Sequence, residues 1–168
     1  MDVAVGLLAL IFFVAIMALT ALAIKLDSEG PVFFAQNRRG SNGRNFSMLK
    51  FRTMTVQENG ESITQATRND PRVTKIGRLL RSASIDELPQ LLNVIRGEMS
   101  LVGPRPHALA HDNYFEKLLQ DYASRYHVKP GMTGWAQVNG LRGATPSVDH
   151  RPPSRDGPLV YQQLESLV

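Results

Sequence analysis

Residues 3–24, with the sequence VAVGLLALIFFVAIMALTALAI, form a run of 22 residues that contains no charged side chain. An α-helix needs roughly 20 apolar residues to cross the hydrocarbon core of a bilayer. A cleaved signal peptide is the competing interpretation, because the Ala-Leu-Ala sequence at residues 21–23 resembles a cleavage site. However, no Lys or Arg precedes the run, and the run is long for the apolar core of a signal peptide. We therefore predict a membrane-inserted helix over residues 1–25.

The rest of the 168-residue chain is polar and basic, and it is long enough to form one domain with its own core. Nineteen Lys and Arg against fifteen Asp and Glu give a net charge of +4, which favours partners that carry phosphate. The absence of cysteine excludes disulfides and thiolate metal sites. Positive charge gathers after the apolar run, which predicts that the following part is cytosolic; the residues concerned are Lys25, Arg38, Arg39, Arg44, Lys50 and Arg52.

The polar part is predicted to contain a short β-hairpin and two amphipathic helices, which makes the fold class α/β and rich in helix. The hairpin is expected from apolar residues 32–34, a turn at Asn42-Gly43 and residues 46–54. Residues 55–70 are polar and lack periodicity, which indicates a loop. Between residues 71 and 97 the apolar positions recur at helical spacing; they are Ile76, Leu79, Leu80, Leu88, Leu91, Leu92 and Ile95.

Two adjacent carboxylates, Asp86 and Glu87, follow the first of these helices. The pattern from Ser84 to Glu87 fits a capping box, which would set both carboxylates in the first turn of a helix. If the helix instead begins with Pro89 as its first residue, the carboxylates lie in the preceding turn. Neighbouring helical residues project about 100° apart, so one carboxylate could attack a substrate while the other binds a metal. A bare Asp-Glu pair is more often a solvated surface feature.

Four motifs in order give this pair its context: KLDSEGPVFFAQNRRGSNGRNF, KFRTM, RSASIDELPQLLNVIRGEMSLVGPRP and HVKPGMTGWAQVNG. Together they resemble the bacterial sugar transferases of the monotopic phosphoglycosyl transferase family, which initiate exopolysaccharide and glycan assembly on undecaprenyl phosphate. The resemblance covers residues 2–149. It implies a catalytic domain over residues 26–149, held on the cytoplasmic face of the bacterial inner membrane.

The resemblance also implies a two-step reaction and a set of site residues. Asp86 matches the family nucleophile, which attacks the β-phosphorus of a UDP-sugar, releases UMP and carries the phosphosugar until the lipid phosphate takes it. Glu87 matches the residue that holds Mg²⁺ against the diphosphate. The substrates implied are a UDP-hexose, with glucose or galactose expected, and undecaprenyl phosphate. The positions that match the family's basic phosphate-site residues are Lys50, Arg81 and Arg105.

The sequence departs from the family pattern at two places. Where the family has Ser-Pro in the middle of the membrane segment, this chain has Val14 and Ala15. Proline bends a helix, so both a re-entrant helix and a straight span are open. Residues 150–168 lack the family's usual acidic and aromatic pattern, and we interpret them as an atypical tail that a frameshift could have produced. Such a change would leave the activity of this chain in question.

Two other classes of function compete with this interpretation. A membrane-anchored module that binds nucleic acid would use the basic excess, but aromatic residues are only 7% and no recognised nucleic-acid motif occurs. No nucleic-acid partner is therefore expected. A truncated, inactive family member that acts as a scaffold is the other alternative.

Overall fold

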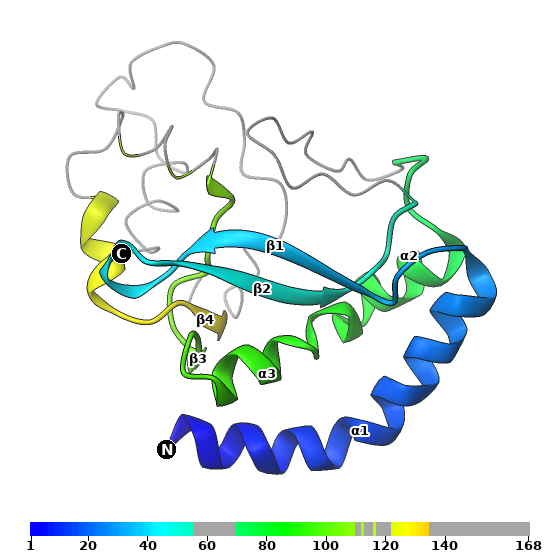
Figure 1. Ribbon diagram of the computed structural model, residues 1–168, viewed down its shortest axis with the longest axis horizontal. Coiled ribbons are helices and arrows are strands. Elements are labelled where there is room, and N and C mark those ends of the chain that lie inside the picture. The colour runs from blue at the N-terminus through cyan, green and yellow to red at the C-terminus, as the bar shows by residue number, and fades with distance from the viewer. Residues whose placement is uncertain (56–69, 110–111, 113–115, 117–121, 135–168) are drawn as a thin grey trace.

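The computed structural model describes residues 1–55, 70–109, 112, 116 and 122–134. Its elements form three tiers, which Figure 1 shows with the hairpin at the top, the short helices in the middle and the long helix α1 below. The predicted mixed α/β fold with an apolar N-terminal helix, few other helices and a β-hairpin is confirmed. The bounds of the helices and strands are α1 Asp2–Asp27, β1 Phe33–Arg39, β2 Asn45–Phe51, α2 Lys75–Ser82, α3 Gln90–Ile95, β3 Ser100–Val102 and β4 Gly131–Thr133.

The hairpin pairs β1 with β2 in antiparallel register, from Phe33 opposite Phe51 to Arg39 opposite Asn45. A one-turn 3₁₀ helix, Ser41–Gly43, joins the strands. Its Asn42 has a φ of 56° and its Gly43 a φ of 69°, a left-handed conformation that Asn and Gly adopt more readily than other residues. The predicted turn at Asn-Gly thus closes the hairpin.

The two predicted amphipathic helices are α2 and α3, and a 3₁₀ turn, Ile85–Glu87, separates them. The predicted capping box is wrong, because Ser84 has a φ of 56° and its side chain forms no capping hydrogen bond. Pro89 is the residue that precedes α3, so the carboxylates lie in the turn before this helix, as the alternative interpretation expected. A left-handed residue that is not glycine ends α2 sharply and starts the turn in a new direction.

Two small apolar clusters hold the tiers together. The first joins α1, β2 and α2 through Ile24, Phe51 and Leu80, and the second contains Met48, Val94 and Met99. Between them, the fully buried Asn93 of α3 accepts a hydrogen bond from the Leu49 amide (3.0 Å) and donates one to the Ser47 carbonyl (2.8 Å). These bonds satisfy backbone groups on the edge of β2 and fix α3 against the hairpin.

A second sheet, which the sequence pattern did not predict, pairs β3 with β4 in parallel. Gly103 and Gly131 allow this pairing, since a Cβ on Gly131 would lie 2.1 Å from the Gly103 amide nitrogen. Only glycine permits so close an approach of two backbones. The sheet fixes the path of the chain just before the Gly-Pro-Arg-Pro segment.

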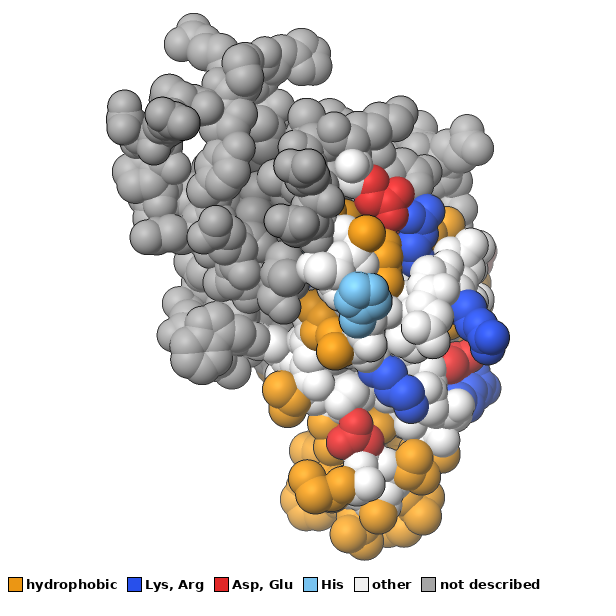
Figure 2. All heavy atoms as spheres, turned by 90° about the vertical axis from the view of Figure 1, so that its left-hand side faces the viewer, with side chains coloured by type: hydrophobic (Ala, Val, Ile, Leu, Met, Phe, Trp, Pro, Cys, Tyr) orange, Lys and Arg blue, Asp and Glu red, His pale blue; other side chains and the backbone are white. Residues whose placement is uncertain are grey.

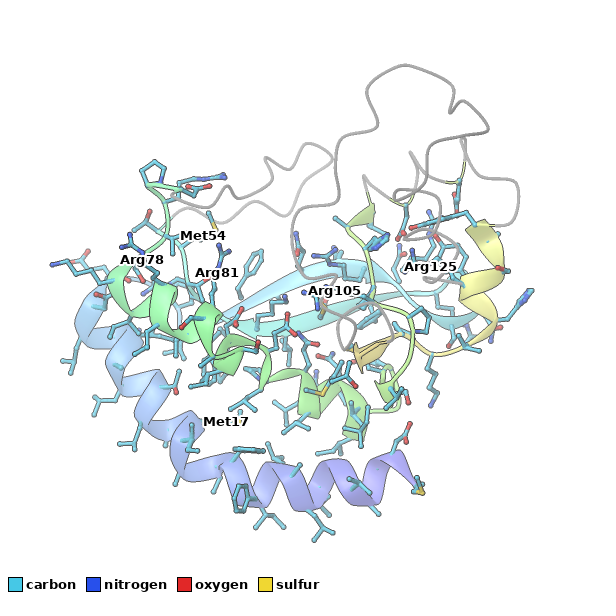
Figure 3. All side chains as sticks on the ribbon, turned by 180° about the vertical axis from the view of Figure 1, so that it is seen from behind. Met17, Met54, Arg78, Arg81, Arg105 and Arg125 are labelled. Atoms are coloured by element: carbon cyan, nitrogen blue, oxygen red, sulfur yellow. The ribbon has the colours of Figure 1, made fainter. Side chains whose placement is uncertain are left out.

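Helix α1 contacts the body of the protein at both of its ends, and Figure 1 shows it bending so that both halves face the short helices. At its start, Asp2 accepts a hydrogen bond from the Ser100 hydroxyl (2.5 Å), and Gly6 packs against Val94. In Figure 3 Met17 lies at the bend, and its side chain packs against the first apolar cluster. A straight helix of 26 residues would be about 39 Å long and would carry Asp2 far from Ser100.

The other end of α1 is fixed by charged side chains. Asp27 accepts a hydrogen bond from the Ile76 amide in the first turn of α2 (3.3 Å). The buried guanidinium of Arg52 donates to the carbonyls of Ser28 (2.6 Å) and Glu29 at the end of α1. A cation at a helix C-terminus satisfies free carbonyls and opposes the negative end of the helix dipole.

The outer surface of α1 is apolar, which Figure 2 shows as orange side chains at the foot of the molecule. It is the one helix among the described residues that is long and apolar enough to cross a membrane. Its large side chains are mostly exposed, for example Phe12 at 75% and Leu8 at 68%. Residues 56–69 of the predicted loop over residues 55–70, and the atypical tail over residues 150–168, lie outside the described residues.

The close packing of α2 on the hairpin can be tested at Gly77. A Cβ at this position would lie 2.1 Å from the Thr53 carbonyl oxygen. We expect Gly77→Ala to lower the free energy of unfolding by about 2 kcal/mol, although alanine favours helix, because it forces two backbones apart. Thermal unfolding in detergent measures this. Arg78→Ala, at an exposed position on the same helix, is the control and should change stability by less than about 0.5 kcal/mol; equal effects would contradict the packing argument.

Candidate functional site

The carboxylate of Glu87 binds two cations that come from distant parts of the chain. Its Oε1 lies 3.1 Å from Nζ of Lys50 on β2 and 2.8 Å from Nη2 of Arg105, which follows β3. The Glu87 side chain is 17% exposed and that of Lys50 is 18% exposed, whereas Arg105 is 40% exposed. The structure thus brings together three of the five residues that the sequence predicted for a site.

The turn that carries the carboxylates is held by the apolar residues at its two ends. Ile85 and Leu88, three positions apart, both pack against the first apolar cluster. Residues three apart lie on the same side of a 3₁₀ helix, so the two positions between them project elsewhere. Asp86 and Glu87 occupy those positions, and the contact of Glu87 with Lys50 shows that its side faces the hairpin.

Asp86 is the neighbour of Glu87 in the chain but takes no part in its two ion pairs. It is only 9% exposed, and among the described residues its carboxylate forms no ion pair or hydrogen bond with another side chain. Its oxygens are therefore not occupied by the cations that bind Glu87. A buried carboxylate without a bound cation is less stabilised as an anion, which makes it a better nucleophile or base.

The two neighbouring carboxyl groups have pKa values that move in opposite directions. Burial raises the pKa of Asp86, and the charge of Glu87 adds to this effect against the opposing charges of Lys50 and Arg81. Burial would also raise the pKa of Glu87, but Lys50 and Arg105 outweigh it and lower that pKa to about 2. The pKa of Lys50 is itself lowered by burial. Glu87 is therefore the permanent anion of the pair.

Arg81 lies at the other end of the site, near the end of α2. Its Nε donates to the Thr53 hydroxyl (3.0 Å), and its Nη2 lies 3.2 Å from the Met54 sulfur. It acts on Asp86 through its charge and not through a direct contact. Figure 3 labels Arg81 and Arg105, and both lie on the side of the short helices that faces away from α1. Arg81 is exposed, so its guanidinium is accessible to an anion from solvent.

The donor set is compatible with a magnesium ion, although no group of three or more potential metal ligands occurs among the described residues. Both contacts of Glu87 with cations use Oε1, so Oε2 remains available. Mg²⁺ is commonly held by one or two carboxylates, with water and substrate phosphates completing its shell. Glu87 with Asp86 fits that requirement only when a phosphate ligand is present.

A buried polar network behind Arg105 escaped the sequence analysis. Arg125, which is 5% exposed, donates to the Arg105 carbonyl and to the Tyr122 hydroxyl (2.6 Å), and its Nη1 lies 2.9 Å from Nδ1 of His107. Tyr122 in turn donates to Asp112 (2.6 Å). The network fixes the backbone that presents Arg105. No spacing rule links these residues, and only the fold reveals their proximity.

Comparison with known proteins places the chain among sugar transferases. A family model described as bacterial sugar transferase matches residues 1–156. A Caulobacter vibrioides protein named UDP-glucose:undecaprenyl-phosphate glucose-1-phosphate transferase is 56% identical over 149 residues, which are 89% of this chain and 56% of that protein. An Escherichia coli protein of the same name is 51% identical over 148 residues, which are 88% of this chain and 32% of that protein.

A third relative carries a different sugar in its name. The Aeromonas hydrophila UDP-N-acetylgalactosamine-undecaprenyl-phosphate N-acetylgalactosaminephosphotransferase is 43% identical over 138 residues, covering 82% of this chain and 33% of that protein. The chain therefore spans between about a third and just over half of the length of these relatives.

The opposite environments of the two carboxylates predict opposite effects of neutralising them. A group whose pKa is lowered by folding, such as Glu87, stabilises the fold above its unfolded pKa and loses this effect as the pH falls toward 2. A group whose pKa is raised, such as Asp86, loses stability for the fold as the pH rises from its unfolded pKa through its folded pKa, and the full cost is present above the folded pKa. At pH 7, we expect Glu87→Gln to lower the free energy of unfolding by about 2 kcal/mol or more, because two cations lose their partner.

Asp86→Asn should leave the midpoint of thermal unfolding unchanged or raise it at pH 7. Differential scanning fluorimetry from pH 7 to pH 3 measures both effects. Glu87→Gln should also reduce the fall of the unfolding midpoint that wild type shows as the pH decreases. Glu29→Gln, which neutralises an exposed carboxylate, is the control. A stabilised Glu87→Gln or a strongly destabilised Asp86→Asn would show that the ion pairs have been assigned to the wrong carboxylate.

Proposed function

The chain belongs to the bacterial sugar transferase family, and we propose that it transfers a hexose 1-phosphate from a UDP-sugar to undecaprenyl phosphate. The observation that carries the proposal is the adjacent carboxylate pair of Asp86 and Glu87, of which one is buried without a cation and the other binds Lys50 and Arg105. Phosphoryl transfer needs a nucleophile and a concentration of positive charge at the same place.

In the first step, an Asp86 carboxylate oxygen attacks the β-phosphorus of the UDP-sugar. A bond forms between this oxygen and the β-phosphorus, and the bond from the β-phosphorus to the oxygen that bridges the two phosphates breaks. UMP leaves with that bridging oxygen, and the sugar phosphate remains on Asp86 as an acyl phosphate. The raised pKa of Asp86, caused first by burial, supports its role as the attacking group.

In the second step, a phosphate oxygen of undecaprenyl phosphate attacks the same phosphorus. The bond to Asp86 breaks, the free carboxylate returns, and the product is an undecaprenyl diphosphate sugar. No net proton is gained or lost over the two steps if every phosphate enters and leaves as an anion. A covalent intermediate allows a soluble donor and a lipid acceptor to use one site in succession.

Glu87 is the proposed magnesium ligand, with Asp86 beside it. When bound, the metal ion would supply positive charge to the diphosphate and to the departing UMP. The chain's own residues carry the rest of the electrostatic task. Arg105, with its guanidinium fork, suits two oxygens of one phosphate, while Lys50 keeps the Glu87 carboxylate in place and Arg81 faces the site from α2.

Glucose is the sugar that the relatives favour for this chain, because two proteins more than 50% identical to it carry UDP-glucose in their names. Galactose is the other hexose that the motifs imply. The product of such a reaction starts the assembly of an exopolysaccharide repeat unit, and a Rhizobium leguminosarum relative that is 47% identical over 148 residues is named as an exopolysaccharide production protein.

We also propose that α1 is inserted in the cytoplasmic leaflet of the inner membrane as a re-entrant helix. Its exposed apolar surface needs a nonaqueous environment, and a lipid acceptor requires the enzyme to lie at a membrane. Both ends of α1 contact the catalytic part, so a helix that enters and leaves on one side fits better than a straight span. The division into residues 1–25, 26–149 and 150–168 remains a prediction.

The reaction can be tested by measuring the release of UMP. We expect the chain, in detergent or nanodiscs with Mg²⁺ and undecaprenyl phosphate, to release UMP from UDP-glucose in preference to UDP-galactose and UDP-N-acetylgalactosamine. Asp86→Asn should reduce this release at least about 10³-fold, because it removes the nucleophile. Glu29→Gln, which changes an exposed carboxylate, should retain full activity.

A covalent intermediate has a second signature. With a UDP-glucose donor labelled in the sugar and no acceptor, the label should remain on the acid-denatured wild-type chain and be released by hydroxylamine. Asp86→Asn should bind none. Rapid turnover without a labelled chain would indicate direct transfer, whereas equal activity of the two chains would remove Asp86 from the mechanism.

The membrane arrangement has its own test, which uses the lack of native cysteine. Val3→Cys at the start of α1 and Asn42→Cys in the hairpin turn each provide a single exposed thiol. In sealed inner-membrane vesicles of known orientation, a membrane-impermeant maleimide should reach both thiols from the cytoplasmic side only. Labelling of Val3→Cys from the periplasmic side would establish a straight span.

A further inference from the structure

Arg38 of β1 presents a guanidinium that the protein itself only partly satisfies. Its Nη2 donates to the Gln36 amide oxygen, and its Nη1 makes one long contact of 3.4 Å with the Pro106 carbonyl. Its Nε is buried and has no hydrogen-bond partner. Among the described residues, no carboxylate forms an ion pair with it. A partly buried guanidinium with a buried, unpaired Nε is costly unless an anion accompanies it.

The position of Arg38 connects it with the site described above. Arg38 forms a β-bridge with Ala108, so the Gly-Pro-Arg-Pro segment runs beside β1. In the hairpin register Arg38 lies opposite Phe46, and Lys50 lies opposite Phe34, which places Arg38 and Lys50 on the same face of the hairpin. Arg38, Lys50 and the neighbouring Arg105 thus converge on one side of the sheet.

Arg38 and Arg105 carry like charges that repel each other. Burial first, and then the charge of Arg105, lower the pKa of Arg38 to about 10, against weaker attraction from Asp112 and Glu87. Glu87 already binds Lys50 and Arg105. The carboxylate of Glu87 therefore does not neutralise both Arg105 and Arg38. Two neighbouring guanidiniums in this state are suited to bind a further anion that has several oxygens.

We propose that Arg38 is a further phosphate-binding arginine, which together with Arg105 holds a phosphate group of a substrate. Gln36 accepts a hydrogen bond from Nη2 of Arg38, whereas Nη1 makes only the long contact with Pro106, so Nη1 is the nitrogen that can donate to a phosphate oxygen. The inference rests on the proposed function, since a phosphate of either the donor or the lipid acceptor would supply the anion. The rival role is structural, in which Arg38 only supports the fold near Asp112.

The first arm of the test measures phosphate binding without catalysis. The full chain in detergent is unfolded by heat with and without inorganic phosphate at constant ionic strength. We expect phosphate to raise the wild-type midpoint by a few degrees and Arg38→Gln to abolish this rise. Without phosphate, Arg38→Gln should unfold at the same or a higher temperature than wild type, because a charge without a partner is removed. Arg44→Gln, an exposed arginine in the hairpin turn, should behave as wild type.

The second arm measures steady-state UMP release. Arg38→Gln should raise KM at least tenfold for UDP-glucose if the phosphate belongs to the donor, or for undecaprenyl phosphate if it belongs to the acceptor. Arg38→Lys, which keeps the charge but loses the fork, should give an intermediate KM. If Arg38→Gln fails to fold, Arg38→Lys with an unchanged KM for both substrates overturns the proposal.

The outcomes separate this inference from the proposed function. A wild-type chain that responds to phosphate through Arg38 but releases no UMP would refute the reaction and support the phosphate site. Normal UMP release together with an unchanged phosphate response and unchanged KM values in Arg38→Gln would overturn the Arg38 proposal alone. A lower midpoint for Arg38→Gln, with phosphate response intact, would assign Arg38 the structural role.

Discussion

The carboxylate of Glu87 is the point on which the site depends, because it draws three separate segments together. Lys50 comes from the hairpin and Arg105 from the chain after β3, and neither segment is otherwise joined to the turn that carries Glu87 by an ion pair among the described residues. Since Glu87 holds the two cations through one oxygen, Asp86 remains unbound although it is the next residue. Burial then dominates its pKa, while at Glu87 the cations dominate. One ion-pair arrangement thus gives two identical functional groups different chemistry.

Helix α1 sets a second constraint, since it is fixed to the same tier that carries the carboxylates. The short helices lie between α1 and the hairpin, and Arg81 and Arg105 face away from α1 (Figure 3). Packed helices are separated by about 10 Å. If α1 occupies the hydrocarbon, as proposed, the turn with Asp86 lies roughly at the level of the lipid head groups. A lipid phosphate would then reach Asp86 with little movement out of the bilayer surface, while a soluble donor arrives from the hairpin side.

The sequence predicted the helices and the hairpin better than the contacts between distant segments of the chain. The hairpin followed from the Asn-Gly turn and its flanking apolar residues, and the helices from their periodicity, because these signals are local. The left-handed Ser84 was missed, since a Ser-x-x-Glu pattern usually marks a capping box. The β3–β4 pair was missed because three-residue strands far apart in the chain leave no periodic pattern. Arg125 lacked any signal, and Arg38 stood out only as one basic residue among several in the first motif, because the importance of both depends on what lies beside them and not on spacing.

Two arginines, the buried Arg52 and the partly buried Arg38, show that the partners of a side chain can distinguish roles that the sequence does not. Arg52 and Arg38 each have a buried Nε without a partner. At Arg52, however, both terminal nitrogens donate to oxygens of Ser28 and Glu29, at the negative end of the α1 dipole, so the fold itself supplies the counter-charge. Arg38 faces another guanidinium and the amide of Gln36, which carries no charge. The fold stabilises the first arginine as an anchor, whereas the second forms no ion pair among the described residues, and we propose that a bound phosphate supplies its counter-charge.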